Sequence, residues 1–107
     1  LTHLYLNGNQ LASFPVTPGV FLLLRELYLD SNQLASFPVT SGVFPALMEL
    51  YLSRNQLTSF PVTSGGLRVL RRLTLVGNDQ LLELPLSLQS CTSLMYLEVN
   101  PALQRQA

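Results

Sequence analysis

One stretch of sixteen residues occurs three times in this chain with few changes, and this repetition constrains the fold more than any other feature. The copies begin at Leu4, Leu27 and Leu50 and read LYLNGNQLASFPVTPG, LYLDSNQLASFPVTSG and LYLSRNQLTSFPVTSG. They stand 23 residues apart, and weaker copies follow at Leu73 and Leu97. A unit of this length that recurs in register is typical of a solenoid, in which each copy forms one coil.

Five units cover the chain, which we interpret as one small domain over residues 1–107. The expected units are 1–23, 24–46, 47–69, 70–93 and a partial unit 94–107, with one residue inserted near Asp79. Terminal coils of a solenoid need polar covers. The first unit opens on a core leucine and the last ends without an evident cap, so we expect these residues to be a piece of a longer protein.

Alternation of leucine with other residues predicts a short strand in every unit. In the pattern x-L-x-L-x the period is two, so one side of each strand should be buried. One strand per unit, always in the same direction, predicts a parallel sheet with right-handed crossovers. Each unit also carries a proline that disfavours helix, so we expect extended, polyproline-like or turn-rich backbone opposite the strands. In the fourth unit, SLQSCTSL could form a short helical turn instead.

An asparagine follows each of the first four strands, where the chain turns inward. Its amide can bond the backbone of its own coil and of the adjacent coil, which predicts a ladder of structural asparagines along the stack. These residues are Asn9, Asn32, Asn55 and Asn78.

The skeleton Leu1-x-x-Leu4-x-Leu6-x-x-Asn9-x-Leu11, with its three further full copies, resembles the leucine-rich repeat across essentially the whole chain. This resemblance implies an α/β-type leucine-rich-repeat solenoid of horseshoe shape. Such a solenoid is a right-handed superhelix with short parallel strands on the concave face. Its convex side would be irregular, 3-10 or polyproline-like. The resemblance also implies a module that binds a protein partner through the concave sheet.

Function is expected where similar coils differ and side chains face solvent, which is at the outward positions of the strands. Tyr5, Tyr28 and Tyr51 share one such position. They reflect either β-propensity and recent duplication, or a contact surface, since tyrosine is favoured in interface cores. The other expected partner-binding residues are Glu26, Glu49, Asp30, Arg54, Arg72 and Thr74.

Two like charges, Glu26 and Glu49, occupy equivalent positions in neighbouring units, with Asp30 close by. They form either a solvated face, because exposed like charges repel only modestly, or a site for an arginine or lysine of the partner. Arg54, Arg71 and Arg72 make the other end of the strip more positive.

Composition and motifs argue against other classes of function. The net charge is zero, so no long-range field favours nucleic acid or an anionic membrane. The longest apolar run, residues 20–24, is too short to span a bilayer. No metal-ligand spacing and no phosphate loop occur, so we expect no metal and no cofactor. The single cysteine, Cys91, lies three coils from the single histidine, His3, so we expect a packed thiol and no enzyme.

Two settings for the intact protein stay open. NQLTSFPVTSGGLRVLRRLTLVGN is similar to the repeats of bacterial secreted effectors of the IpaH and SspH ubiquitin-ligase class. That similarity implies a target-recognition module with catalysis in another domain, which the repeats would also contact. The Gly-Val-Phe triplets at 19–21 and 42–44 instead suggest the ectodomain of an immune or adhesion receptor. Extracellular repeats usually carry cysteine-rich caps, which are missing here. This favours the cytoplasm, and the host cytoplasm for an effector.

Overall fold

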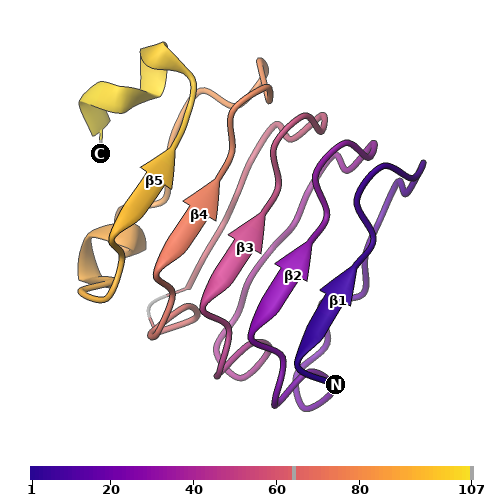
Figure 1. Ribbon diagram of the computed structural model, residues 1–107. Coiled ribbons are helices and arrows are strands. Elements are labelled where there is room, and N and C mark those ends of the chain that lie inside the picture. Colours follow the sequence, from indigo (N-terminus) through magenta and orange to yellow (C-terminus); the bar gives the residue numbers. More distant parts are fainter. Residues whose placement is uncertain (64, 107) are drawn as a thin grey trace.

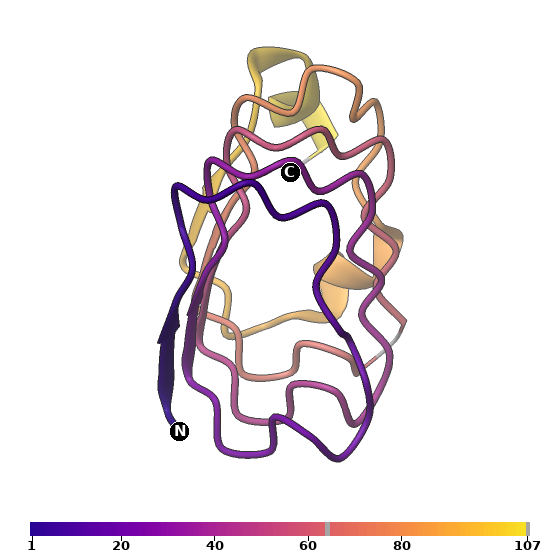
Figure 2. The same cartoon turned by 90° about the vertical axis from the view of Figure 1, so that its right-hand side faces the viewer.

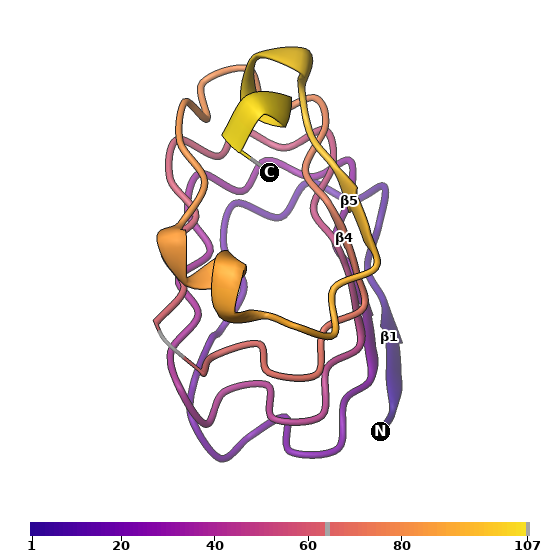
Figure 3. The same cartoon turned by 90° about the vertical axis from the view of Figure 1, so that its left-hand side faces the viewer.

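The computed structural model describes residues 1–63 and 65–106, and it confirms the predicted solenoid. Five short strands form one parallel sheet in chain order (Figure 1). They are β1 (His3–Tyr5), β2 (Glu26–Tyr28), β3 (Glu49–Tyr51), β4 (Arg72–Thr74) and β5 (Tyr96–Glu98). Viewed along the stack, successive coils surround a common interior, with the sheet on one side (Figures 2 and 3).

The strands pair in register, so each residue lies beside its equivalent in the next unit. Leu4 pairs with Leu27, Leu27 with Leu50, and the series continues through Leu73 to Leu97. The residue inserted near Asp79 lies after β4 and leaves this register intact.

Leucines from successive coils fill the interior of the rings. The central leucines of β2, β3 and β4 are fully buried, whereas Leu4 and Leu97 in the outer coils are partly buried. Phenylalanines from the first three coils form a second part of this core, with ring centroids 5.4–6.5 Å apart. Each coil therefore buries its apolar sides only against its neighbours, as the solenoid interpretation requires.

The side opposite the sheet is extended and turn-rich, as predicted from the prolines. Isolated parallel bridges join Ser36 to Ser59 and Val39 to Val62. In the fourth coil the predicted helical turn is present as the 3-10 helix η1 (Leu86–Ser90), which lies across the ring from the sheet (Figure 3). A second 3-10 helix, η2 (Pro101–Gln106), follows β5. No helix in residues 1–63 and 65–106 is long and apolar enough to cross a membrane.

The predicted bonds between coils are present for three of the four asparagines, Asn32, Asn55 and Asn78. The Asn55 amide donates to Leu29 O and Leu52 O, both at 3.0 Å, and its Oδ1 accepts from Leu34 N–H at 3.0 Å. Each such residue ties its own coil to the preceding one, and Asn32 and Asn78 make the equivalent bonds. Asn9 bonds only carbonyls of its own coil and is exposed.

Where the fifth coil departs from the repeat pattern, the Asn100 side chain accepts a hydrogen bond that a backbone carbonyl accepts in the other coils. In the third coil, Arg54 N–H donates to Val76 O of the next coil at 2.8 Å. The equivalent donor in the fourth coil, Gly77 N–H, instead bonds Asn100 Oδ1 at 2.9 Å. The Asn100 carbonyl is used elsewhere, because it accepts from Leu103 N–H at 2.8 Å where η2 begins. The side chain thus preserves the contact between coils while the backbone leaves the coil.

We expect Asn55→Ala to lower the free energy of unfolding by about 2–3 kcal/mol, because buried groups of Leu29 and Leu34 lose their partner. Asn9→Ala removes no hydrogen bond between coils, so it should lower the free energy of unfolding by less than about 1 kcal/mol. Denaturant unfolding of the two variants measures the difference. Equal losses would show that the bonds between coils contribute nothing beyond those within a coil.

Candidate functional site: the exposed face of the sheet

The three predicted tyrosines form one row on neighbouring strands. Tyr5 and Tyr28 have ring centroids 4.6 Å apart, and Tyr28 and Tyr51 have centroids 4.3 Å apart with rings only 11° from parallel. In-register strands about 4.8 Å apart hold equivalent rings at stacking distance. Tyr5 is 61% exposed, whereas stacking leaves Tyr28 and Tyr51 half-buried. We call the outward side chains of β1–β5 and of the turns that follow them the sheet face.

Carboxylates beside this row are held by the tyrosines themselves. Residues two apart on a strand point to the same side, and accordingly Tyr28 OH donates to Glu26 Oε1 at 3.0 Å. Tyr51 OH donates to Glu49 Oε1 in the same way. Glu26 Oε2 also lies 3.2 Å from His3 Nε2. Glu26 and Glu49, both predicted site residues, are therefore oriented by neighbours on the sheet face.

Burial and the carboxylates keep these phenols neutral. Desolvation raises the pKa of Tyr51 far above its ordinary value, and the hydrogen bond to Glu49 raises it further. Desolvation also raises the pKa of Tyr28, with a contribution from its bond to Glu26. A neutral hydroxyl can donate a hydrogen bond and an ionised one cannot. The raised pKa values therefore extend the range in which both hydroxyls can donate to pH values above the ordinary tyrosine pKa of about 10.

The other end of the sheet face has the same residue types in a different arrangement. Arg72 Cζ lies 4.3 Å from the ring centroid of Tyr96, in a cation–π contact. Tyr96 OH donates to Glu98 Oε2 at 2.9 Å, so tyrosine now precedes its carboxylate along the strand. Tyr96 and Glu98 were not among the predicted site residues. Aligning the fifth unit with the others marks both as outward-facing, but nothing in the sequence shows that Arg72 stacks on Tyr96.

A shallow hollow of about 460 Å³ lies between the tyrosines of β3 and β5. It forms because small residues, Ser53 and Thr74, occupy positions flanked by large side chains. Thr74, a predicted partner-binding residue, is only 8% exposed and lines the floor. Ser53 is also buried, and its hydroxyl has no hydrogen-bond partner among residues 1–63 and 65–106. The remaining predicted residues, Asp30, Arg54 and Arg72, border this hollow.

Arg54 reaches the sheet face from a strained position. Its φ is 55°, in the left-handed region that favours glycine, and Nε donates to Ser31 Oγ at 3.3 Å. The equivalent residue of the next coil is Gly77, with φ +86°. A Cβ there would come within 2.9 Å of Arg54 Cγ and 3.1 Å of Arg54 N. Arg54 can therefore lie where it does because the next coil has no side chain at this point.

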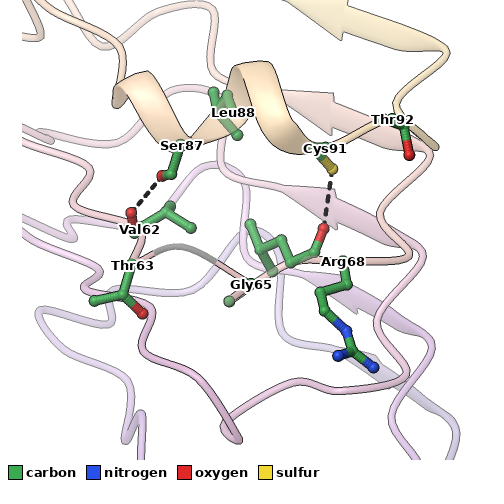
Figure 4. Close-up of a pocket in the computed structure, with 10 residues that line it drawn as sticks. Val62, Thr63, Gly65, Arg68, Ser87, Leu88, Cys91 and Thr92 are labelled. Atoms are coloured by element: carbon green, nitrogen blue, oxygen red, sulfur yellow. Dashed lines mark hydrogen bonds between the residues drawn. The ribbon is translucent and has the colours of Figure 1, made fainter.

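A second hollow, of about 310 Å³, lies on the opposite side beside η1 (Figure 4). Ser87 Oγ donates to Val62 O across it, and Cys91 Sγ donates to Leu67 O at 2.9 Å. Burial raises the pKa of the Cys91 thiol, and the side chain packs against the core. Cys91 therefore packs against the core, as expected from the sequence, although it is only partly buried. Within the described residues, no three His, Cys, Asp or Glu side chains gather as metal ligands.

The in-register strands and the asparagine ladder agree with the comparison to known families. The family described as leucine rich repeat matches residues 23–79, more than half of the chain. The chain belongs to the leucine-rich repeat family. No curated protein and no solved structure matches it. Leucine-rich repeats generally mediate protein–protein interaction and are typically non-catalytic. The match concerns the repeat itself and does not distinguish effector from receptor.

Raised tyrosine pKa values predict a loss of stability in alkali. The unfolded chain ionises Tyr28 and Tyr51 near pH 10, whereas the folded leucine-rich repeat keeps them neutral. The contribution of these two tyrosines to the free energy of unfolding should therefore be constant below about pH 10 and fall as pH rises above it. Tyr51→Phe should make this fall less steep, as measured by denaturant unfolding over a pH series. A slope unchanged by Tyr51→Phe would contradict the origin assigned to it.

Gly77→Ala should destabilise the protein more than Gly42→Ala. Both glycines have positive φ, so each substitution carries a backbone penalty of about 1 kcal/mol. A Cβ at Gly42 meets nothing within 4 Å, whereas one at Gly77 meets Arg54. We expect the Gly77 variant to lose about 1–3 kcal/mol more, measured as a difference in unfolding free energy. Equal losses would indicate that the Arg54 turn moves aside freely.

Proposed function

We propose that the sheet face binds a protein partner and that the tyrosine row (Tyr5, Tyr28 and Tyr51) is the centre of that contact. The stacking of these rings in one accessible row is the observation that carries the proposal. Tyrosine supplies large contact area and is enriched among residues that dominate binding energy. Because stacking and the Glu26 and Glu49 bonds already restrict the rings, binding would order few side chains and cost little entropy.

Charge along the sheet face favours a partner of mixed charge. Glu26 and Glu49 keep unused lone pairs and would accept hydrogen bonds from an arginine or lysine of the partner. At the other end, Arg72 presents its guanidinium on the Tyr96 ring and would pair with a carboxylate. Glu26 and Arg72 are two strands apart, which separates the two charge contacts by about 10 Å.

The size of the surface supports a recognition module acting within a larger protein. Five strands span about 20 Å, so this face offers an interface of standard size at most. The similarity of NQLTSFPVTSGGLRVLRRLTLVGN to effector repeats supports a secreted bacterial effector whose catalytic domain lies elsewhere. The alternative, a receptor ectodomain, is supported by the Gly-Val-Phe triplets. A full-length reading frame separates them, since a downstream catalytic domain indicates the effector and cysteine-rich caps with a signal peptide indicate the receptor.

Tyr28→Ala combined with Tyr51→Ala should abolish capture of the partner by the intact protein. Losing the stacked rings removes the proposed centre of the contact and should also lower stability by about 1–3 kcal/mol. Quantified affinity capture, with circular dichroism to confirm folding, is the measurement.

Leu86→Ala is the matched control for this experiment, because Leu86 is 80% exposed and belongs to η1, across the ring from the sheet. Capture should be unaffected by this change. Tyr28→Phe with Tyr51→Phe retains the rings and should retain most of the binding. If the double alanine variant still captures the partner, the tyrosine row is not the binding surface.

A further inference from the structure

Charges in this protein are segregated although they sum to zero. The segments 17–25, 40–48, 65–71 and 91–95 lead into the last four strands along the lower edge of the sheet in Figure 1. They contain no Asp or Glu, but they contain Arg25, Arg68 and Arg71. Four of the six carboxylates lie instead on the sheet face and its adjoining turn: Glu26, Asp30, Glu49 and Glu98. This edge is therefore basic, and it lies beside a sheet face that carries these four carboxylates together with Arg54 and Arg72.

A groove on this edge lies between two arginines. Arg25, Met48 and Arg71 hold equivalent positions in successive coils, because Met48 N–H bonds Arg25 O at 2.8 Å and Arg71 N–H bonds Met48 O at 2.7 Å. A shallow hollow of about 550 Å³ includes these three residues together with Ala46 and Val69. We call these five residues the rim groove. Between the two arginines, the residues of the rim groove are apolar.

The guanidinium groups of the two arginines of the rim groove are available to a ligand. Among the described residues, neither Arg25 nor Arg71 makes a side-chain hydrogen bond or ion pair, and both are exposed. Arg54 and Arg72, by contrast, are engaged with Ser31 and Tyr96. Free guanidinium groups beside an apolar surface are suited to carboxylates, which they bind in bidentate geometry.

Apolar side chains are also exposed around the groove. Leu23, equivalent to Ala46 and Val69 in its coil, is 69% exposed, and Val69 itself is 39% exposed. Met95, which follows Arg71 in the next coil, is 79% exposed. Exposed apolar residues bordered by charge mark interaction surfaces more often than isolated ones do.

We propose that the rim groove is a second interaction surface that takes an acidic segment of a partner protein. The segment would place two carboxylates about 10 Å apart, one on each arginine, since Arg25 and Arg71 are two coils apart. An apolar side chain between them would cover Met48 and Val69. In a polyproline II conformation, which has three residues per turn and rises about 3.1 Å per residue, carboxylates three residues apart lie on the same side at about this spacing.

A peptide fits this surface better than an anionic membrane does. Membrane recognition by charge typically uses clusters of four to eight basic residues, whereas the described part of this edge carries three. The carboxylates of the sheet face also lie next to the edge and would be repelled by anionic lipid. The proposal is independent of the sheet-face function, because it uses none of the tyrosine-row residues.

Nuclear magnetic resonance of labelled methionine methyl groups tests the proposal directly. The protein has two methionines, and Met48 lies inside the rim groove. Titration with the acetylated, amidated tetrapeptide Glu-Leu-Leu-Glu should shift the Met48 signal in a saturable way. The matched probe Gln-Leu-Leu-Gln should bind at least about tenfold more weakly, the change expected for losing roughly 1.4 kcal/mol.

Matched variants locate the binding. Arg25→Gln with Arg71→Gln should weaken Glu-Leu-Leu-Glu binding at least about tenfold, while Arg68→Gln, on the same edge but outside the groove, should change it less than about twofold. Tyr28→Ala with Tyr51→Ala should leave probe binding unchanged.

Three outcomes would overturn the proposal. They are equal binding of the two probes, equal loss in the Arg68 and double-arginine variants, and binding of phosphatidylglycerol vesicles without any response to the peptide. The last outcome would assign the edge to membranes.

Discussion

The bond from each buried asparagine to the coil before it is the interaction on which the rest of the structure depends. A single coil exposes apolar surface on both sides and has backbone groups that its own strand cannot satisfy. Asn32, Asn55 and Asn78 satisfy those groups across the gap between coils. Where the pattern ends, Asn100 preserves one contact between coils with a side-chain oxygen in place of a carbonyl. Stacking in register is therefore specified by hydrogen bonds as well as by leucine packing.

The in-register pairing of the strands also determines which side chains lie next to one another on the surface. Parallel strands about 4.8 Å apart turn a residue repeated in sequence into a continuous column in space. Tyrosines stack, and each carboxylate comes within reach of the tyrosine two residues along its strand. On the adjacent edge, the same spacing puts Arg25 and Arg71 on either side of Met48. The constant spacing of the repeats within the chain maintains the fold. Differences between units at outward positions produce surfaces of different charge.

Much of the fold and part of the sheet face were predictable from the sequence, because a regular repeat permits few alternative arrangements of the coils. The strand positions, the inward leucines, the asparagine ladder and the row of tyrosines all follow from a 23-residue period with period-two alternation. Other features depend on contacts between residues that are far apart or differ between units. The burial of Thr74, the stacking of Arg72 on Tyr96 and the fit of Arg54 over Gly77 arise where neighbouring coils carry side chains of different size.

The sequence by itself determined the coil, its direction of stacking and the columns of outward residues, because these depend on a periodic pattern that every unit repeats. Only the tertiary structure decided how side chains within a column use one another. It set the tyrosine–carboxylate bonds that hold Glu26 and Glu49, and within the described residues it left Arg25 and Arg71 unpaired beside a largely apolar groove. Periodicity specifies which residues become neighbours, whereas rotamers, desolvation and local size differences decide which of those neighbours bind each other.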